Sequence, residues 1–271
     1  MLRLGYGQLD TYAAWTANNY FDLNADQRQE FSRRFDRLHD WHRYEQLPEY
    51  VAFLGATQAR LQKGLARADV LWVMEGIKQR YRLLVRHGAD DAAALLVTVT
   101  PTQVESLKQR WERDNRRFVG EYRLDEGAAA RREASLRRLY ARITDWTGSL
   151  SPEQEQKIAA MAGDVPFIHE LRLEDRRRRQ RDFLQLMMAR HDDPRAFAER
   201  LRHFLSNWEE GRAPEYDRQY RAWEQRQADI YIAVEKMLTP QQRAAVLRRV
   251  EGYMTDFTRL SARPSRVAVP Q

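Results

Sequence analysis

The segment Leu238-Thr239-Pro240-Gln241-Gln242 has the composition of a helix start, and the chain contains four versions of it. Thr239 can cap exposed backbone N–H groups, Pro240 loses no hydrogen bond at the first helical position, and Gln242 can reach back to the cap. Each version predicts a helix whose cap stabilises it by about 1 kcal/mol. The other three are Leu23-Asn24-Ala25-Asp26-Gln27, Val99-Thr100-Pro101-Thr102-Gln103 and Leu150-Ser151-Pro152-Glu153-Gln154. Their unequal spacing excludes a regular solenoid and suggests a loose duplication of helix pairs.

Between these starts, apolar residues recur every three or four positions, which is typical of amphipathic helices. One stripe runs from Phe31 to Trp41, and its helix is expected to end where Pro48 follows Leu47. The pattern predicts an all-α fold, an extended multi-helix assembly of about ten to twelve amphipathic helices. Because the apolar stripes are narrow, we expect the assembly to leave a concave surface open.

The break at Gly148 and Ser149 is the best place to divide the chain. We expect an N-terminal helical half over 1–148, a C-terminal helical half over 149–261 and a disordered tail over 262–271. The repeated helix starts suggest that the two halves are loosely duplicated.

The composition of the 271 residues excludes several classes of protein. The absence of cysteine rules out thiol catalysis, disulfides and thiolate metal sites. No P-loop, G-x-G-x-x-G or G-x-S-x-G motif occurs, so phosphoryl transfer, dinucleotide chemistry and serine nucleophiles lack support. No apolar run is long enough to span a membrane. We therefore predict a protein that is not an enzyme and has no cofactor.

The net charge is +7, from 46 Lys and Arg against 39 Asp and Glu. A basic surface can attract nucleic acid, anionic lipid or acidic polypeptide. The densest basic block is Arg176–Arg179 with Arg181. Side chains so close together on a helix point in several directions, which favours a solvent-exposed helix with ion pairs over a single anion site.

His39, His42 and Glu45 lie within reach of one helix face and could form a metal or acid–base cluster. Metal sites usually take ligands from two elements, so a structural interpretation is favoured: His42 packs with Trp41 at a helix end, while Arg43 and Glu45 make local ion pairs. The remaining histidines, including those at 87, 169, 191 and 203, are isolated and predict no site.

Asp114 and Asn115 interrupt an otherwise apolar stripe. A polar group on a buried face needs a hydrogen bond, so we expect a partner such as Arg117, Tyr122 or a residue of another helix, rather than a ligand site.

A second aromatic stripe contains Tyr216, Tyr220 and Trp223 and alternates with arginines. Aromatic and arginine side chains are typical of protein-binding surfaces, although a stripe at helical spacing is more often core.

The repeated helix start resembles the LTxxQ signature of the Spy/CpxP periplasmic proteins, which are small helical proteins that include an ATP-independent chaperone. A broader pattern runs through nearly the whole chain: Arg3-Leu4, Tyr6, Asp10, Tyr20-Phe21-Asp22-Leu23, Gln27, Trp41-His42-Arg43, Glu45, Leu47-Pro48, Tyr50, Asn115, Glu121-Tyr122 and Arg176–Arg181. This pattern resembles an uncharacterised family of proteobacterial outer-membrane lipoproteins, domain of unknown function 6279. In that family a lipobox cysteine that carries an acyl anchor precedes this start, whereas this chain opens with Met1.

The resemblances imply a periplasmic protein, anchored to the outer membrane as a lipoprotein, whose membrane contact is made only through an N-terminal acyl anchor missing from this chain. We predict that it binds unfolded polypeptide or other envelope proteins, as a chaperone-like, assembly or stress factor, and not nucleic acid. The alternatives are a basic nucleic-acid-binding protein and a metal-dependent enzyme. The candidate partner-binding residues are Trp41, His42, Arg43, Glu45, Tyr50, Asn115, Tyr122, Arg176, Arg177, Arg179, Tyr216, Tyr220 and Trp223.

Overall fold

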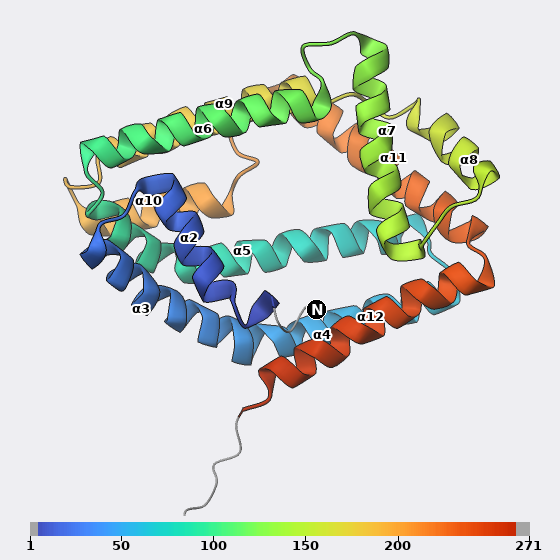
Figure 1. The fold of residues 1–271 in the computed structure, drawn as a ribbon, viewed down its shortest axis with the longest axis horizontal. Helices are drawn as coiled ribbons and strands as arrows, with labels where there is room; N and C mark the ends of the chain where they lie inside the picture. The colour runs from blue at the N-terminus through green and yellow to red at the C-terminus, as the bar shows by residue number, and fades with distance from the viewer. Residues whose placement is uncertain (1–4, 264–271) are drawn as a thin grey trace, which may run out of the picture.

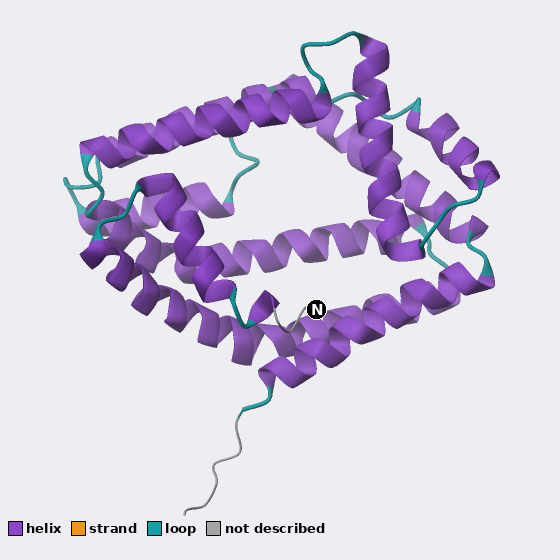
Figure 2. Ribbon diagram, in the orientation of Figure 1, coloured by secondary structure: helices purple, strands orange, loops and turns teal. Residues whose placement is uncertain are grey.

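The computed structural model describes residues 5–263, and within this range the chain is helical and has no strand (Figure 2). The elements whose bounds are given within the described residues are α2 (Leu9–Phe21), α3 (Ala25–Trp41), the π-helical turn η1 (His42–Gln46), α4 (Leu47–Lys63), α5 (Arg67–Val97), α6 (Pro101–Tyr122), α7 (Ala128–Thr147), α8 (Pro152–Ala162), α9 (His169–Met188), α10 (Pro194–Ser206), α11 (Pro214–Met237) and α12 (Pro240–Ser261). The predicted all-α class is confirmed. Most of the predicted tail, residues 264–271, lies outside the described residues.

The helices are arranged as a frame (Figure 1). Helices α6 and α9 lie along one long edge, α4 and α12 lie along the opposite edge, and α5 runs between the two edges. Two extensive helix pairs, α5 with α10 and α4 with α12, join helices from opposite sides of Gly148. The parts of the chain on either side of the expected boundary therefore share packing surfaces.

The capping glutamines of α3 and α6 are bonded to each other across 76 residues of sequence. Gln27 Nε2 donates to Gln103 Oε1 at 3.1 Å, and Gln103 Nε2 donates to Gln27 Oε1 at 2.6 Å. Each Oε1 also accepts from the backbone N–H of its own N-cap. Each Nε2 also donates to a carbonyl two residues before the partner's cap, at Thr98 and Asp22 respectively, both at 2.9 Å. The oxygen and the nitrogen of each buried side-chain amide therefore both have hydrogen-bond partners.

The same arrangement joins α8 and α12 across 88 residues. Gln154 and Gln242 donate to each other at 2.9 and 3.0 Å. Gln154 also donates to the Met237 carbonyl and Gln242 to the Ser149 carbonyl, both at 2.8 Å. All four predicted capping boxes are confirmed, and they form two equivalent pairs, one on each side of Gly148.

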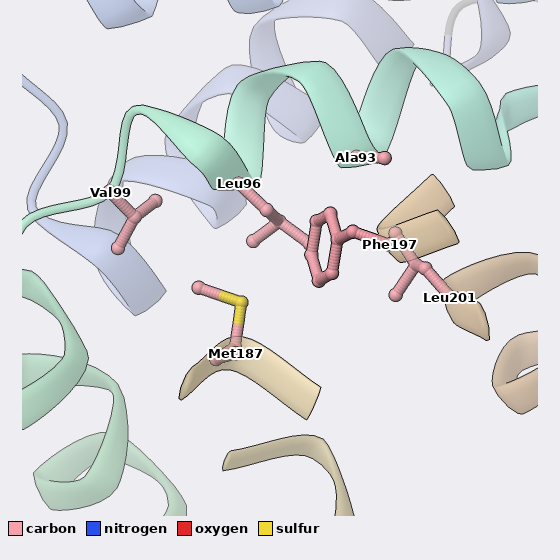
Figure 3. Close-up of a cluster of buried hydrophobic side chains, with 6 residues drawn as sticks. All are labelled: Ala93, Leu96, Val99, Met187, Phe197 and Leu201. Carbon is pink, nitrogen blue, oxygen red and sulfur yellow. The ribbon is translucent and has the colours of Figure 1, made fainter. Parts of the chain in front are cut away.

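A small buried apolar cluster accompanies each glutamine pair. The first joins the ends of α5 and α9 to α10 and consists of Ala93, Leu96, Val99, Met187, Phe197 and Leu201 (Figure 3). The second joins α7, α8 and α11 and consists of Leu139, Ile143, Ile158, Ile230 and Val234. Burial of a large apolar side chain contributes about 1.5–3 kcal/mol, so these clusters anchor the helices that line the site described below.

None of the helices within residues 5–263 combines the length and apolarity needed to cross a lipid bilayer.

The prediction that a helix ends at Pro48 is wrong. Helices α3 and α4 are joined without a break through the π turn His42–Gln46, which directly precedes Leu47 and Pro48. In this turn the backbone N–H of Leu47 donates to the His42 carbonyl, five residues back. A proline inside a helix lacks an N–H and crowds the carbonyl four residues back, and the wider π turn accommodates both defects.

Candidate functional site

A hollow of about 820 Å³ lies between α6, α9, α11 and the loop that joins α10 to α11. Most of the side chains in its wall are aromatic rings and arginines. We call it the arginine hollow and define it by Tyr20, Trp111, Phe118, Glu121, Tyr122, Arg142, Arg172, Asp175, Arg176, Arg179, Gln180, Phe183, Phe204, Trp208, Arg212, Tyr216, Tyr220 and Trp223.

Two arginines are held in the wall of the hollow by aromatic rings. The Arg212 guanidinium lies 4.6 Å from the ring centre of Tyr220 and 5.2 Å from that of Tyr216, and its side chain is 7% exposed. Arg179 lies 4.4 Å from the ring centre of Phe204. Burial lowers the pKa of Arg179 and raises the pKa of Tyr216 and Tyr220. A desolvated cation–π contact contributes about 2 kcal/mol, so these rings stabilise the two guanidinium groups in the wall.

Three further arginines line the hollow and form no ion pair within the described part of the chain; they are Arg142, Arg172 and Arg176. The two carboxylates of the wall are already engaged with other arginines. Glu121 lies 3.2 Å from Arg138, and Asp175 lies 2.8 Å from Arg178. The hollow therefore carries positive charge that the neighbouring carboxylates do not neutralise, and it is suited to an anionic group.

A smaller cavity of about 330 Å³, which we call the side pocket, adjoins the hollow. The two share Tyr122, Arg142, Arg172 and Trp223, which we call the junction residues. Beyond the junction the wall is mostly apolar and includes Leu136, Leu139, Ala159, Ala162, Val165, Pro166 and Phe167. The side pocket thus has a mainly apolar wall, and two arginines lie where it meets the hollow.

His169, the first residue of α9, forms part of the side-pocket wall. It is 8% exposed, and its ring stacks on that of Tyr122 with the centres 3.8 Å apart. Burial and then the neighbouring Arg172 lower the pKa of His169 to about 4, so the ring is neutral at neutral pH. Its Nδ1 atom is buried and has no hydrogen-bond partner among the described residues.

The structure brings six of the predicted partner-binding residues together in the arginine hollow. They are Tyr122, Arg176, Arg179, Tyr216, Tyr220 and Trp223. Arg177 is exposed on α9 and does not line the hollow. Tyr216 is only 3% exposed, so this end of the aromatic stripe belongs to the core as well as to the wall.

Asn115 is enclosed by the protein rather than presented to a partner. It is 1% exposed, its Nδ2 donates to Gln180 Oε1 at 2.9 Å, and its Oδ1 accepts from Gln180 Nε2 at 3.3 Å. The neighbouring Asp114 accepts a hydrogen bond from Tyr20 at 2.6 Å. The predicted core hydrogen bond to another helix is confirmed, whereas Asn115 is inaccessible as a partner-binding residue.

The predicted residues Trp41, His42, Arg43, Glu45 and Tyr50 surround the π turn and line neither cavity. His42 is held between two tyrosines: Nδ1 lies 2.9 Å from Tyr6 Oη, and Nε2 lies 3.2 Å from Tyr50 Oη. Burial lowers the pKa of His42. Because both ring nitrogens are engaged, His42 serves the packing of this junction.

The local ion pairs predicted for Arg43 and Glu45 are wrong for the described residues. Arg43 Nε donates at 2.6 Å to the carbonyl of Leu260, while Glu45 is exposed. The last carbonyls of a helix lack partners within the helix, so the end of α12 attracts the guanidinium. Within residues 5–263, no three His, Asp or Glu side chains are grouped so that they could hold a metal ion.

The structure adds residues that the sequence did not distinguish. Arg142, Arg172 and Arg212 line the hollow, and His169 forms part of the wall of the side pocket. Basic residues are spread along the whole chain, so no local pattern separates these from the arginines that form ion pairs.

The sequence matches a model described as a family of unknown function (DUF6279) over residues 19–217. The chain belongs to this family. The DUF6279 match includes Arg142, Arg172, Arg176 and Arg212, and it stops in the first turn of α11 before Tyr220. No curated protein and no solved structure matches the chain. The predicted resemblance to DUF6279 is confirmed.

Proposed function

We propose that this DUF6279 protein binds unfolded or partly folded polypeptide reversibly, without nucleotide, as a chaperone-like or assembly factor. The arginine hollow carries this proposal. Five arginines and a set of aromatic rings line one concave wall, and the carboxylates of that wall are already paired. Arginine and aromatic side chains dominate the energetics of protein recognition. An extended chain with acidic and aromatic side chains would find partners for both.

We also propose that the protein acts in the periplasm as an outer-membrane lipoprotein and contacts other envelope proteins there. The support is the resemblance to the lipoprotein family and the similarity of the four helix starts to the LTxxQ signature. The precursor sequence tests this part: a signal peptide that ends in a lipobox cysteine is expected.

The binding proposal is tested by measuring light scattering from a chemically denatured client protein during dilution. The wild-type protein is expected to suppress scattering at near-stoichiometric amounts. Replacing Arg172 and Arg176 with glutamine removes two unpaired charges of the hollow and should raise the required amount about tenfold. Arg177→Gln is the matched control, because Arg177 lies on the same helix, is exposed and does not line the hollow.

Two results would contradict the proposal. The first is a wild-type protein that neither suppresses aggregation nor retains any envelope protein. The second is tight oligonucleotide binding that falls steeply with salt and is lost in the double variant, because phosphate contacts give such a salt dependence. That result would assign the hollow to nucleic acid.

A further inference from the structure

The side pocket is large enough for one bulky side chain, and its wall is mainly apolar, with Arg132, Glu133, Ser135, Arg138 and Gln227 as its other polar members beside His169 and the junction residues. Its volume of about 330 Å³ is at the small end of ligand pockets, which span about 300–1,000 Å³. Leu136, Leu139 and Val165 contribute apolar atoms to the wall, and the neutral ring of His169 closes part of it. An apolar group that enters the pocket gains by leaving water.

The junction places unpaired cations where this apolar pocket meets the hollow. Among the described residues, Arg142 donates only to the neutral Gln227 Oε1, at 3.5 Å, and Arg172 lies 5.9 Å from the ring centre of Phe118. A guanidinium has five N–H donors, so both arginines have donors to spare. Guanidinium groups bind carboxylates through two parallel hydrogen bonds, which gives geometric selectivity.

Glu133, the acidic residue in the side-pocket wall, forms its ion pairs with arginines other than Arg142 and Arg172. Glu133 lies 3.4 Å from Arg123 and 4.0 Å from Arg137. A ligand with complementary charge would therefore carry an anionic group that lies at the junction. Because Arg142 and Arg172 line the side pocket together with its apolar residues, a ligand whose anion and apolar group are close neighbours suits it.

We propose that the site selects the C-terminal residue of a polypeptide, with its apolar side chain in the side pocket and its α-carboxylate on Arg142 and Arg172. This inference rests on the proposed function and names the part of the polypeptide that is recognised. A chain terminus fits because it carries an apolar side chain and a carboxylate on the same carbon atom. Residues that precede the terminus lie in the arginine hollow, which meets the side pocket at the junction.

The first test compares three eight-residue peptides labelled with a fluorophore at the N-terminus. One ends in phenylalanine with a free carboxylate, the second is its C-terminal amide, and the third ends in serine with a free carboxylate. Fluorescence anisotropy with the full chain is expected to show binding of the first peptide about tenfold tighter than either of the others.

Variants of Arg142 and Arg172 test whether the preference for the free acid over the amide depends on the junction residues. Arg142→Gln and Arg172→Gln each replace an exposed side chain and should each weaken the preference for the free acid, and the double variant should make the free acid and the amide bind equally. Arg177→Gln should keep the full preference, because Arg177 lies outside both cavities. Circular dichroism of each variant checks that the helices are intact.

Equal binding of the free acid and the amide to the wild-type protein would overturn this inference. The proposed function would stand if the same protein still suppressed aggregation. Displacement of the peptide by dodecanoate, with no preference for one peptide terminus over another, would assign the pocket to a free lipid carboxylate and overturn the inference as well. If no peptide binds and aggregation is not suppressed, both proposals fail.

Discussion

Replacing Gln154 with alanine should remove four hydrogen bonds that converge on one buried amide. Its Oε1 accepts from the backbone N–H of Ser151 at 2.9 Å and from Gln242 Nε2 at 3.0 Å. Its Nε2 donates to the Met237 carbonyl at 2.8 Å and to Gln242 Oε1 at 2.9 Å. The substitution therefore removes one hydrogen bond of the α8 capping box and both hydrogen bonds between Gln154 of α8 and Gln242 of α12.

The magnitude follows from the number of bonds. A hydrogen bond contributes about 0.5–1.5 kcal/mol net, so the loss of four lowers the free energy of unfolding by about 4 kcal/mol. Alanine favours helix slightly more than glutamine, which offsets less than about 0.5 kcal/mol of this loss. Because the free energy of unfolding of a whole domain is about 5–15 kcal/mol, the hydrogen bonds of this single buried amide account for a large share of it.

Urea unfolding followed by circular dichroism at 222 nm measures the effect. Gln225→Ala is the matched control, since Gln225 is exposed on α11, and its cost should stay within about 0.5 kcal/mol. The two bonds between Gln154 and Gln242 are lost in either single variant. The double variant should therefore cost less than the sum of the two by about 1–3 kcal/mol.

The reasoning would be refuted if Gln154→Ala cost no more than the Gln225→Ala control. Strict additivity of Gln154→Ala and Gln242→Ala would refute the pairing itself, because the two side chains would then act independently.

Three further substitutions test the burial of His169 and the packing around two glycines. The unfolded chain binds more protons than the folded chain between the pKa of about 4 for His169 and the ordinary value of 6.5. The free energy of unfolding should therefore fall by at most about 3 kcal/mol as the pH drops through this window. In His169→Gln the urea midpoint should depend less on pH over the same window. Equal pH dependence in the variant and the wild type would contradict the burial of a neutral ring. A Cβ at Gly76 would lie 2.4 Å from Phe53 Cε2, so Gly76→Ala should destabilise the protein by about 1–3 kcal/mol. Gly252→Ala meets nothing within 4 Å and should stabilise its helix by about 0.5–1 kcal/mol; thermal melts that rank the two variants in the opposite order would contradict the structure.

The helix starts could be predicted from sequence because they depend on contacts within three residues. The Thr239 hydroxyl accepts from the N–H of Gln242, and the Gln242 amide accepts from the N–H of Thr239. The π turn before Pro48 could not be predicted in the same way. Local propensity shows that a proline disfavours a regular turn, but it does not show whether the helix ends or widens there.

The pairing of the glutamines was decided by tertiary structure. Four similar helix starts offer several ways to form two pairs, and no feature of one segment identifies its partner. The chain joins Gln27 to Gln103 and Gln154 to Gln242, because the intervening helices return to the same place only in the folded state. Once buried together, the amides bond to each other because water no longer reaches them.

The sequence by itself determined where the helices begin, the all-α class and the presence of aromatic and basic side chains on α9 and α11. Among the described residues, tertiary structure decided which arginines are left without a carboxylate: Arg138 of α7 pairs with Glu121 of α6, whereas Arg142, four residues further along α7, lines the arginine hollow without an ion pair. The physical reason is the separation along the chain of the groups that interact. A helix cap is complete within one turn, but the neutralisation of a charge depends on which side chains the whole fold brings within a few ångströms.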